Sequence, residues 1–172
     1  EFMVRSISER LVKNYNDDVT VITSNAYNCE AFFSPEMQVM PPITEIINGV
    51  KIIRCPFNPI ITKFLRKHIN IFKNIPIYDL FRFIANGPLS FNMLYKTINF
   101  EEIDVIMATT FPVLQMLYSY ISGKLNQKPV VLSGCFHIND PNFDNSIFYK
   151  MCQTADAYIT NSEDEKEFLI KK

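Results

Sequence analysis

Residues 103–134 read IDVIMATTFPVLQMLYSYISGKLNQKPVVLSG, and this stretch decides the expected fold. Its first part, Asp104–Thr109, has the short apolar and β-branched pattern of a strand. Phe111–Leu125 predicts a helix with Pro112 in its first turn. Pro129–Ser133 is nearly continuous in apolar residues, which is typical of a parallel strand covered on both faces. A strand, a helix and a second strand in this order predict two parallel strands joined by a crossover.

The same alternation continues on both sides of this unit. Further strands are predicted at Val19–Thr23, Ile43–Ile47, Val50–Arg54 and Ala157–Thr160, the middle two around an Asn48-Gly49 turn. Further helices are predicted at Glu1–Asn14, Ile60–Asn74, Pro76–Ala85, Leu89–Ile98 and Asn142–Gln153. A last helix opens at Ser162, with Glu165 three residues on, which is the spacing of a capping box. The pattern predicts an α/β fold, a Rossmann-like three-layer domain with a mainly parallel β-sheet.

The sequence opens on a helix, although the right-handed crossover rule expects a parallel strand before it. We therefore expect the domain to lack its first strand. Because that strand normally lies in the middle of the sheet, its loss would leave unpaired edges on Val19–Thr23 and Asp104–Ala108.

Composition limits the classes of function. The chain has 172 residues, 48% hydrophobic and 20% charged, with a formal net charge of −1, which fits one globular domain and gives no global electrostatic case for nucleic acid. No apolar stretch approaches the roughly 20 residues of a membrane span, and no signal-peptide pattern opens the sequence. The four cysteines lack CxxC spacing, which favours structural thiols in a cytoplasmic protein and no metal site.

Candidate ligand residues follow from the sheet, because open parallel sheets bind ligands at the carboxyl ends of their strands. This rule selects Thr109, Thr110 and Phe111 after one strand, and Gly134–His137 after the next. Thr23–Asn25 and Asn161–Ser162 end two further strands. The chain contains neither GxGxxG nor a Walker A motif, which argues against a nicotinamide cofactor or a P-loop.

His137 is the sharpest single candidate, and two interpretations of it are open. A histidine just past a buried strand can bind a sugar hydroxyl or stabilise developing charge. The alternative is a histidine that satisfies a carbonyl group of its own loop. Asp140, beside Pro141, is more typical of a turn starter than of a catalytic carboxylate. Ser162 is a helix cap first and a ligand contact second.

The segment Ile60–Asn74 also has two interpretations. It predicts an amphipathic helix with Lys63, Arg66, Lys67 and Lys73 on one face and Phe64 among the residues of the apolar face. Such a helix can lie in a membrane interface, with Lys63, Phe64, Arg66 and Lys67 as the membrane-facing candidates. The alternative is an ordinary surface helix whose apolar face meets the core.

The segments together resemble the N-terminal half of the retaining glycosyltransferases of family 4. Residues 1–11 (EFMVRSISERL) match the segment directly after the glycines of the family's glycine-rich loop, and residues 18–23 (DVTVIT) and 47–56 (INGVKIIRCP) are similar to its second and third strands. Residues 103–106 (IDVI) and 111–112 (FP) resemble its fourth strand and next helix. Residues 129–137 (PVVLSGCFH) are similar to the strand that ends in the family's acceptor-site histidine, and residues 155–162 (ADAYITNS) close the match.

The resemblance implies one half of a GT-B fold and transfer of a hexosyl group, with retention, from a nucleotide-sugar donor to a glycan or lipid-linked acceptor. It implies no metal. His137 becomes the candidate catalytic residue, near the reacting centre, while Thr109, Thr110, Phe111, Asp140 and Ser162 are expected on the acceptor side. A lipid-linked acceptor would place the protein on the inner face of a membrane.

The departures from the family pattern are also informative. The glycine-rich loop and the C-terminal domain that holds the donor nucleotide are absent from the sequence. We therefore expect residues 1–172 to be an incomplete N-terminal domain that is inactive by itself. A second class of function stays open, a non-catalytic flavodoxin-like α/β module that binds a ligand or regulates. That class predicts a strand-first start and a self-contained pocket.

Overall fold

Strands form two separate three-stranded sheets in the computed structural model, which describes residues 2–110 and 112–172. The first sheet has the order β1 (Thr20–Ser24), β3 (Val50–Cys55), β2 (Thr44–Ile47). β1 runs parallel to β3, whereas β2 and β3 form an antiparallel hairpin. Asn48 and Gly49 make its turn, and both have the positive φ that the Asn-Gly pair predicts.

The second sheet is entirely parallel, with the order β4 (Ile106–Thr109), β5 (Val130–Ser133), β6 (Ala157–Ile159). Ala108 lies opposite Leu132, and Leu132 lies opposite Tyr158. Val130 and Leu132 are fully buried, as their continuous apolar pattern predicts. The β-α-β unit predicted from residues 103–134 is therefore confirmed.

β1 and β4 do not pair with each other, so each keeps one open edge in the described part of the chain. The backbone N–H groups of Ile106 and Thr110 donate to the carbonyls of Pro129, just before β5, and Ser133, at its end. Because backbone groups alternate along a strand, those of Met107 and Thr109 point to the opposite, open edge. Met107 is 43% exposed, which agrees with an uncovered edge of β4. The unpaired edges expected on these two strands are therefore present in the described residues.

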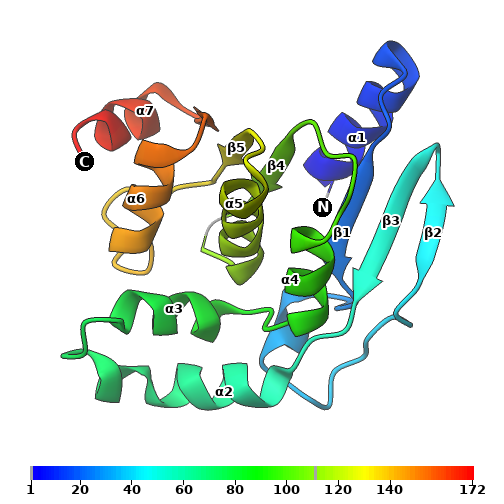
Figure 1. Ribbon diagram of the computed structural model, residues 1–172. Coiled ribbons are helices and arrows are strands. Elements are labelled where there is room, and N and C mark those ends of the chain that lie inside the picture. Colours follow the sequence, from blue (N-terminus) through cyan, green and yellow to red (C-terminus); the bar gives the residue numbers. More distant parts are fainter. Residues whose placement is uncertain (1, 111) are drawn as a thin grey trace.

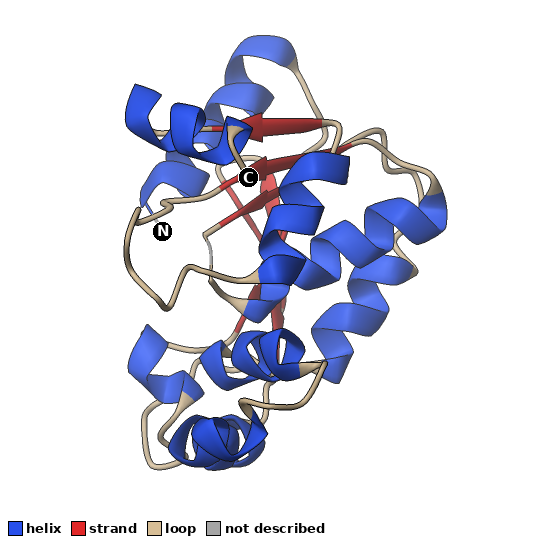
Figure 2. Cartoon of the chain, turned by 90° about the vertical axis from the view of Figure 1, so that its left-hand side faces the viewer, coloured by secondary structure: helices blue, strands red, loops and turns tan. Residues whose placement is uncertain are grey.

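Helices pack against strands of both sheets, in an arrangement compatible with a Rossmann-like three-layer α/β fold (Figure 2). The bounds are α1 (Phe2–Tyr15), α2 (Pro59–His68), α3 (Tyr78–Asn86), α4 (Phe91–Ile98), α5 (Leu114–Asn126), α6 (Ser146–Thr154) and α7 (Glu163–Ile170), with short 3₁₀ turns η1 (Cys29–Phe32) and η2 (Ile69–Phe72). α5 packs on β4 and β5, α4 packs on α5 and β1, and α2 lies beside α3 (Figure 1).

The core lies between these helices and the sheets. Phe83, Met93, Met116 and Phe148 are among its most deeply buried side chains. α5 approaches β5 so closely that a Cβ atom on Gly123 would lie 2.0 Å from a methyl group of Val130. A glycine is therefore required at this crossing of helix and strand.

Several helix starts differ from the predicted ones because a capping side chain fixes them. The helix predicted from Leu89 begins at Phe91, since the Ser90 hydroxyl accepts a hydrogen bond from the Met93 N–H at 3.0 Å. The helix predicted from Asn142 begins at Ser146, because Asn145 caps it in the same way. The helix predicted from Phe111 begins at Leu114. Pro88 precedes a helix but does not start one.

The predicted helix Ile60–Asn74 is broken into α2 and η2, and its apolar face was assigned wrongly. Thr62 and Leu65 are the buried residues of α2. Ile60 and Phe64, predicted on an apolar face opposite the basic residues, are 65% and 58% exposed. Phe64 shares the outward face with Lys63 and Lys67, whereas Arg66 stacks over the Phe33 ring at 4.0 Å.

Candidate functional site

The carboxyl ends of β4 and β5 lie side by side and carry the predicted ligand residues. Thr109 ends β4 and is half-buried, and Thr110 is exposed. Thr110 has a φ of 76°, and its N–H donates to the Ser133 carbonyl at 3.1 Å, which ties it to the end of β5. A positive φ is uncommon for a β-branched residue and marks a constrained turn. Phe111, the third predicted residue here, lies outside the described residues.

Beyond β5 the chain alternates between the core and solvent. Phe136 is 8% exposed, with its ring centroid 5.4 Å from that of Phe148 and 5.2 Å from that of Phe168. His137 is therefore turned outward and is exposed. Its imidazole sits edge-on against the Phe143 ring, with the centroids 4.8 Å apart. The Phe143 ring thus packs against one side of the imidazole, and the His137 residue as a whole remains exposed.

Glu165 fixes the part of the chain directly before His137. Its carboxylate is buried, with the residue only 3% exposed, and accepts from the Phe136 N–H at 3.3 Å. It also accepts from the Tyr158 hydroxyl at 2.9 Å and from the Asn161 N–H at 2.8 Å. Burial, and then the bond to Glu165, raise the pKa of Tyr158 above its usual range, so the phenol stays a donor. One carboxylate therefore joins the ends of β5 and β6.

The predicted capping of α7 by Ser162 is confirmed. Its hydroxyl accepts from the Glu165 N–H at 3.2 Å, as a capping box requires. The reciprocal bond is shifted by one residue, since Glu165 accepts from Asn161 instead of Ser162. Asn161 in turn donates to the Gly134 carbonyl. Its cap bond gives the Ser162 hydroxyl a structural role.

Arg82 and Asp79 of α3 fix the part of the loop that follows His137. The Arg82 guanidinium donates to the carbonyls of Pro141 and Asp144 and pairs with Asp79 at 3.1 Å. Asp79 also accepts from the Ser146 N–H at 2.8 Å and from its hydroxyl at 2.5 Å. Burial opposes ionisation of Asp79, but these bonds from Ser146 and Arg82 outweigh it, and the pKa of Asp79 is lowered.

Asp140 is a turn residue, as its position beside Pro141 indicates. One carboxylate oxygen accepts from both the backbone and the side-chain nitrogen of Asn142, each at 2.9 Å. This is the geometry of an Asx turn. The carboxylate thus shapes the loop after His137, and its second oxygen is the part left for a ligand.

The end of β1 does not contribute in the same way. Ser24 and Asn25 are buried, and the Asn25 amide donates to the Met40 carbonyl at 2.7 Å. The backbone of Asn25 also bonds to Cys55 and Met40. The third strand end selected from the sequence is thus closed by its own loop.

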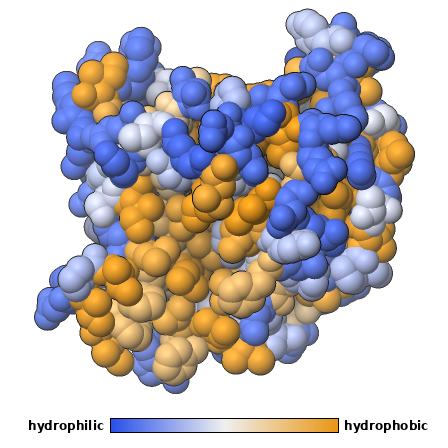
Figure 3. Space-filling model, in the orientation of Figure 1, coloured by the Kyte–Doolittle hydropathy of each residue, from blue (hydrophilic) through white to orange (hydrophobic). Residues whose placement is uncertain are grey.

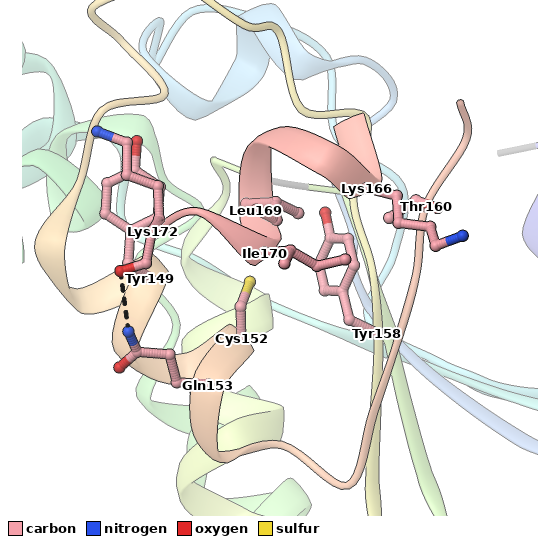
Figure 4. Close-up of a pocket in the computed structure, with 9 residues that line it drawn as sticks. All are labelled: Tyr149, Cys152, Gln153, Tyr158, Thr160, Lys166, Leu169, Ile170 and Lys172. Carbon is pink, nitrogen blue, oxygen red and sulfur yellow. Dashed lines mark hydrogen bonds between the residues drawn. The ribbon is translucent and has the colours of Figure 1, made fainter. Parts of the chain in front are cut away.

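Two cavities lie away from His137. One of about 210 Å³ lies between α6, β6 and α7, lined by residues that include Cys152, Tyr158 and Lys166 (Figure 4). Burial, and then the negative charge of Glu165, raise the pKa of Cys152 to about 12, so its thiol is protonated and a poor nucleophile near neutral pH. The other, of about 420 Å³, lies at the amino end of the second sheet, beside Ile98–Ile103. Neither cavity is a better candidate for chemistry than the strand ends.

The described residues hold no cluster of three or more His, Cys, Asp or Glu side chains able to bind a metal ion. All four cysteines are free thiols, Cys29 and Cys135 exposed and Cys55 buried. Within the same residues, no helix is both long and apolar enough to cross a membrane.

Sequence reasoning missed two residues that fix the site. Glu165 was assigned only a capping role, yet it joins three segments. Arg82 drew no attention, although it and Asp79 are an i, i+3 ion pair inside an apolar segment. The sequence did contain a signal for Arg82: two charged residues of opposite sign stand close together in an otherwise apolar helix. Charged groups near a core are normally paired, so these two were candidates for buried contacts.

Comparison of the chain with protein-family models, with curated proteins and with solved structures finds no match. The function is therefore inferred from the motifs and from the geometry of the strand ends.

Proposed function

We propose that this chain is the acceptor-binding half of a retaining glycosyltransferase that takes a sugar from a nucleotide-sugar donor. The observation that carries the proposal is His137, an exposed imidazole at the carboxyl edge of a parallel sheet, on a loop held at both ends. This agrees with the order of motifs that resembles family 4 glycosyltransferases.

The geometry suits recognition of a hydroxylated acceptor. A neutral imidazole has one donor and one acceptor nitrogen, so it can bind a sugar hydroxyl in either sense. Thr109 and Thr110 add polar groups at the neighbouring strand end. Because Glu165 and Arg82 fix the loop on either side of His137, little orientational freedom is left to lose on binding.

The proposal assigns the donor nucleotide to a second domain. The chain has no glycine-rich phosphate loop, and the part of it that the structure describes offers no cluster of basic groups at the strand ends. His137 would act on the acceptor side of the reaction, as a hydrogen-bonding group close to the attacking hydroxyl.

Acceptor binding can be tested by NMR on the 172-residue chain, because it contains only two histidines. A panel of hexoses and oligosaccharides should move the imidazole signals of His137 and leave those of His68 unchanged. His137→Ala should weaken binding of the sugar about tenfold, the size of one hydrogen bond. His68→Ala is the matched control, because His68 is half-buried against the Phe64 ring on α2.

In an enzyme that contains this domain, His137→Ala should lower kcat/KM by about 10²-fold, the order expected for a positioned acid–base or electrostatic group. Affinity for the nucleotide should stay the same. Retention is checked by the anomeric configuration of the product. Sugars that move neither histidine, or a variant with unchanged turnover, would rule the proposal out. A non-sugar ligand that moves His137 alone would favour a regulatory α/β module.

A further inference from the structure

The outward face of α2 combines exposed apolar and basic side chains. Ile60, Lys63, Phe64 and Lys67 follow the i, i+3, i+4, i+7 spacing that places residues on one side of a helix. Ile60 and Phe64 are 65% and 58% exposed, and both lysines are exposed. The opposite side buries Thr62 and Leu65 against the domain. α2 is therefore anchored by one face while a second apolar stripe faces solvent.

The chain that follows α2 adds to this surface. Ile71 is 73%, Ile77 51% and Ile75 41% exposed, with Lys73 among them. α2 and this turn lie at one end of the molecule, away from α1 and α7 (Figure 1). Figure 3 shows hydrophobic surface gathered over the α2 and α3 end. Apolar residues exposed singly are ordinary, whereas a contiguous patch of them marks an interaction surface.

The charge of this end is opposite to that of the rest of the chain. Residues 59–78 contain Lys63, Arg66, Lys67 and Lys73 and no Asp or Glu. Since the whole chain carries −1 and this segment carries +4, the remainder carries −5. The Lys63 ammonium lies 3.9 Å from Glu36, and both side chains are mostly exposed, so this pair holds Lys63 only weakly.

We propose that the α2 face formed by Ile60, Lys63, Phe64 and Lys67, with the isoleucines of the following turn, docks on an anionic lipid bilayer. Apolar side chains can enter the headgroup boundary, while lysine stems extend along them and keep the ammonium groups at the anionic headgroups. A protein partner fits less well, because the cores of protein interfaces are depleted in lysine. Lipid docking by α2 does not depend on the proposed sugar transfer and is tested separately.

Co-sedimentation of the 172-residue chain with vesicles tests the proposal. Vesicles of phosphatidylcholine with phosphatidylserine should bind the protein, and vesicles of phosphatidylcholine alone should bind it far more weakly. Lys63→Gln/Lys67→Gln should lower the partition coefficient about 30-fold, because each lysine near an anionic surface contributes roughly a factor of five. Phe64→Ser should lower it at least about tenfold, since it removes apolar area that enters the lipid.

Matched controls lie on other surfaces. Lys13→Gln/Lys171→Gln makes the same change in net charge on α1 and just after α7, where both lysines are exposed. Phe91→Ser removes an aromatic ring that is 71% exposed on α4. Both controls should partition like the unmodified chain. Far-ultraviolet circular dichroism checks that each variant is folded. We expect all of them to fold, because every substituted residue is exposed.

Three results would overturn the proposal. The first is no binding of the unmodified chain to either kind of vesicle, and the second is an equal loss in the test and control variants. The third is that Phe64→Ser binds like the unmodified chain while soluble polyglutamate binds as tightly as anionic vesicles. The surface would then be a simple electrostatic site for an acidic polymer.

Discussion

Replacing Glu165 with glutamine should loosen the loop that carries His137. The carboxylate accepts from three donors, the Phe136 and Asn161 N–H groups and the Tyr158 hydroxyl. A glutamine can place its carbonyl where Oε1 lies and keep the bonds to Phe136 and Tyr158. Its amide nitrogen then faces the Asn161 N–H, donor to donor, and the Asn161 N–H loses its partner.

The size of the effect follows from these bonds. A hydrogen bond to a charged group contributes about 1.5–3 kcal/mol, so Glu165→Gln should lower the free energy of unfolding by about 2–3 kcal/mol. Glu165→Ala removes all three bonds and leaves a void, for a loss of about 5 kcal/mol. For a chain of this size, 1 kcal/mol shifts Tm by about 2–4 °C, so the glutamine variant should melt about 5–10 °C lower.

The assay is thermal and urea unfolding at pH 7, combined with amide hydrogen exchange. Glu163→Gln is the control, because the Glu163 side chain is 70% exposed and its pair with Lys166 contributes about 0.5 kcal/mol or less. In Glu165→Gln, exchange at Asn161, whose N–H loses its acceptor, should also accelerate. If the two variants are equally stable, the buried carboxylate does not hold the strand ends together, and the reasoning is refuted.

Two further predictions concern acid stability and the open strand edge. Because the pKa of Asp79 is lowered in the folded state, its stabilising effect is present above its unfolded pKa and is lost as the pH falls through the folded value. Asp79→Asn should therefore cost about 1–2 kcal/mol at pH 7, and the difference from the unmodified chain should shrink below about pH 4 in urea unfolding; a constant difference would contradict this. The amide of Met107 faces the open edge of β4, so it should exchange at least about 100-fold faster than that of Val131 in the interior of the same sheet. Equal protection would mean that a further strand covers this edge.

Most of the secondary structure could be predicted from local signals. The apolar pattern at Pro129–Ser133 correctly predicted a parallel strand, and the Asn48-Gly49 pair correctly predicted a hairpin turn. Both signals depend on neighbouring residues alone. The predicted first residues of helices were less accurate. Several neighbouring residues could cap α4 or α6, and the sequence does not show that Ser90 and Asn145 are the ones that do. The exposure of His137 follows from the structure, because the neighbouring Phe136 is buried and adjacent side chains of this segment face opposite ways.

The assignment of faces on α2 failed for a physical reason. A helical pattern shows which residues share a side, but not which side meets the domain. The buried face of α2 includes Thr62, whose hydroxyl bonds to the Asn58 carbonyl at 3.2 Å, and so a polar residue is buried while Phe64 is exposed. Such a choice depends on the loop and on the helix packed against α2.

The sequence by itself determined the α/β class and the parallel β4–α5–β5 unit, because periodicity and turn residues act over a few positions. Only the tertiary structure decided that Glu165 joins β5 to β6 across 29 residues and that Arg82 holds a loop 59 to 62 residues away. Those partners are set by how the elements pack, since a buried carboxylate or guanidinium bonds to whichever groups the fold places beside it. No local pattern contains that information.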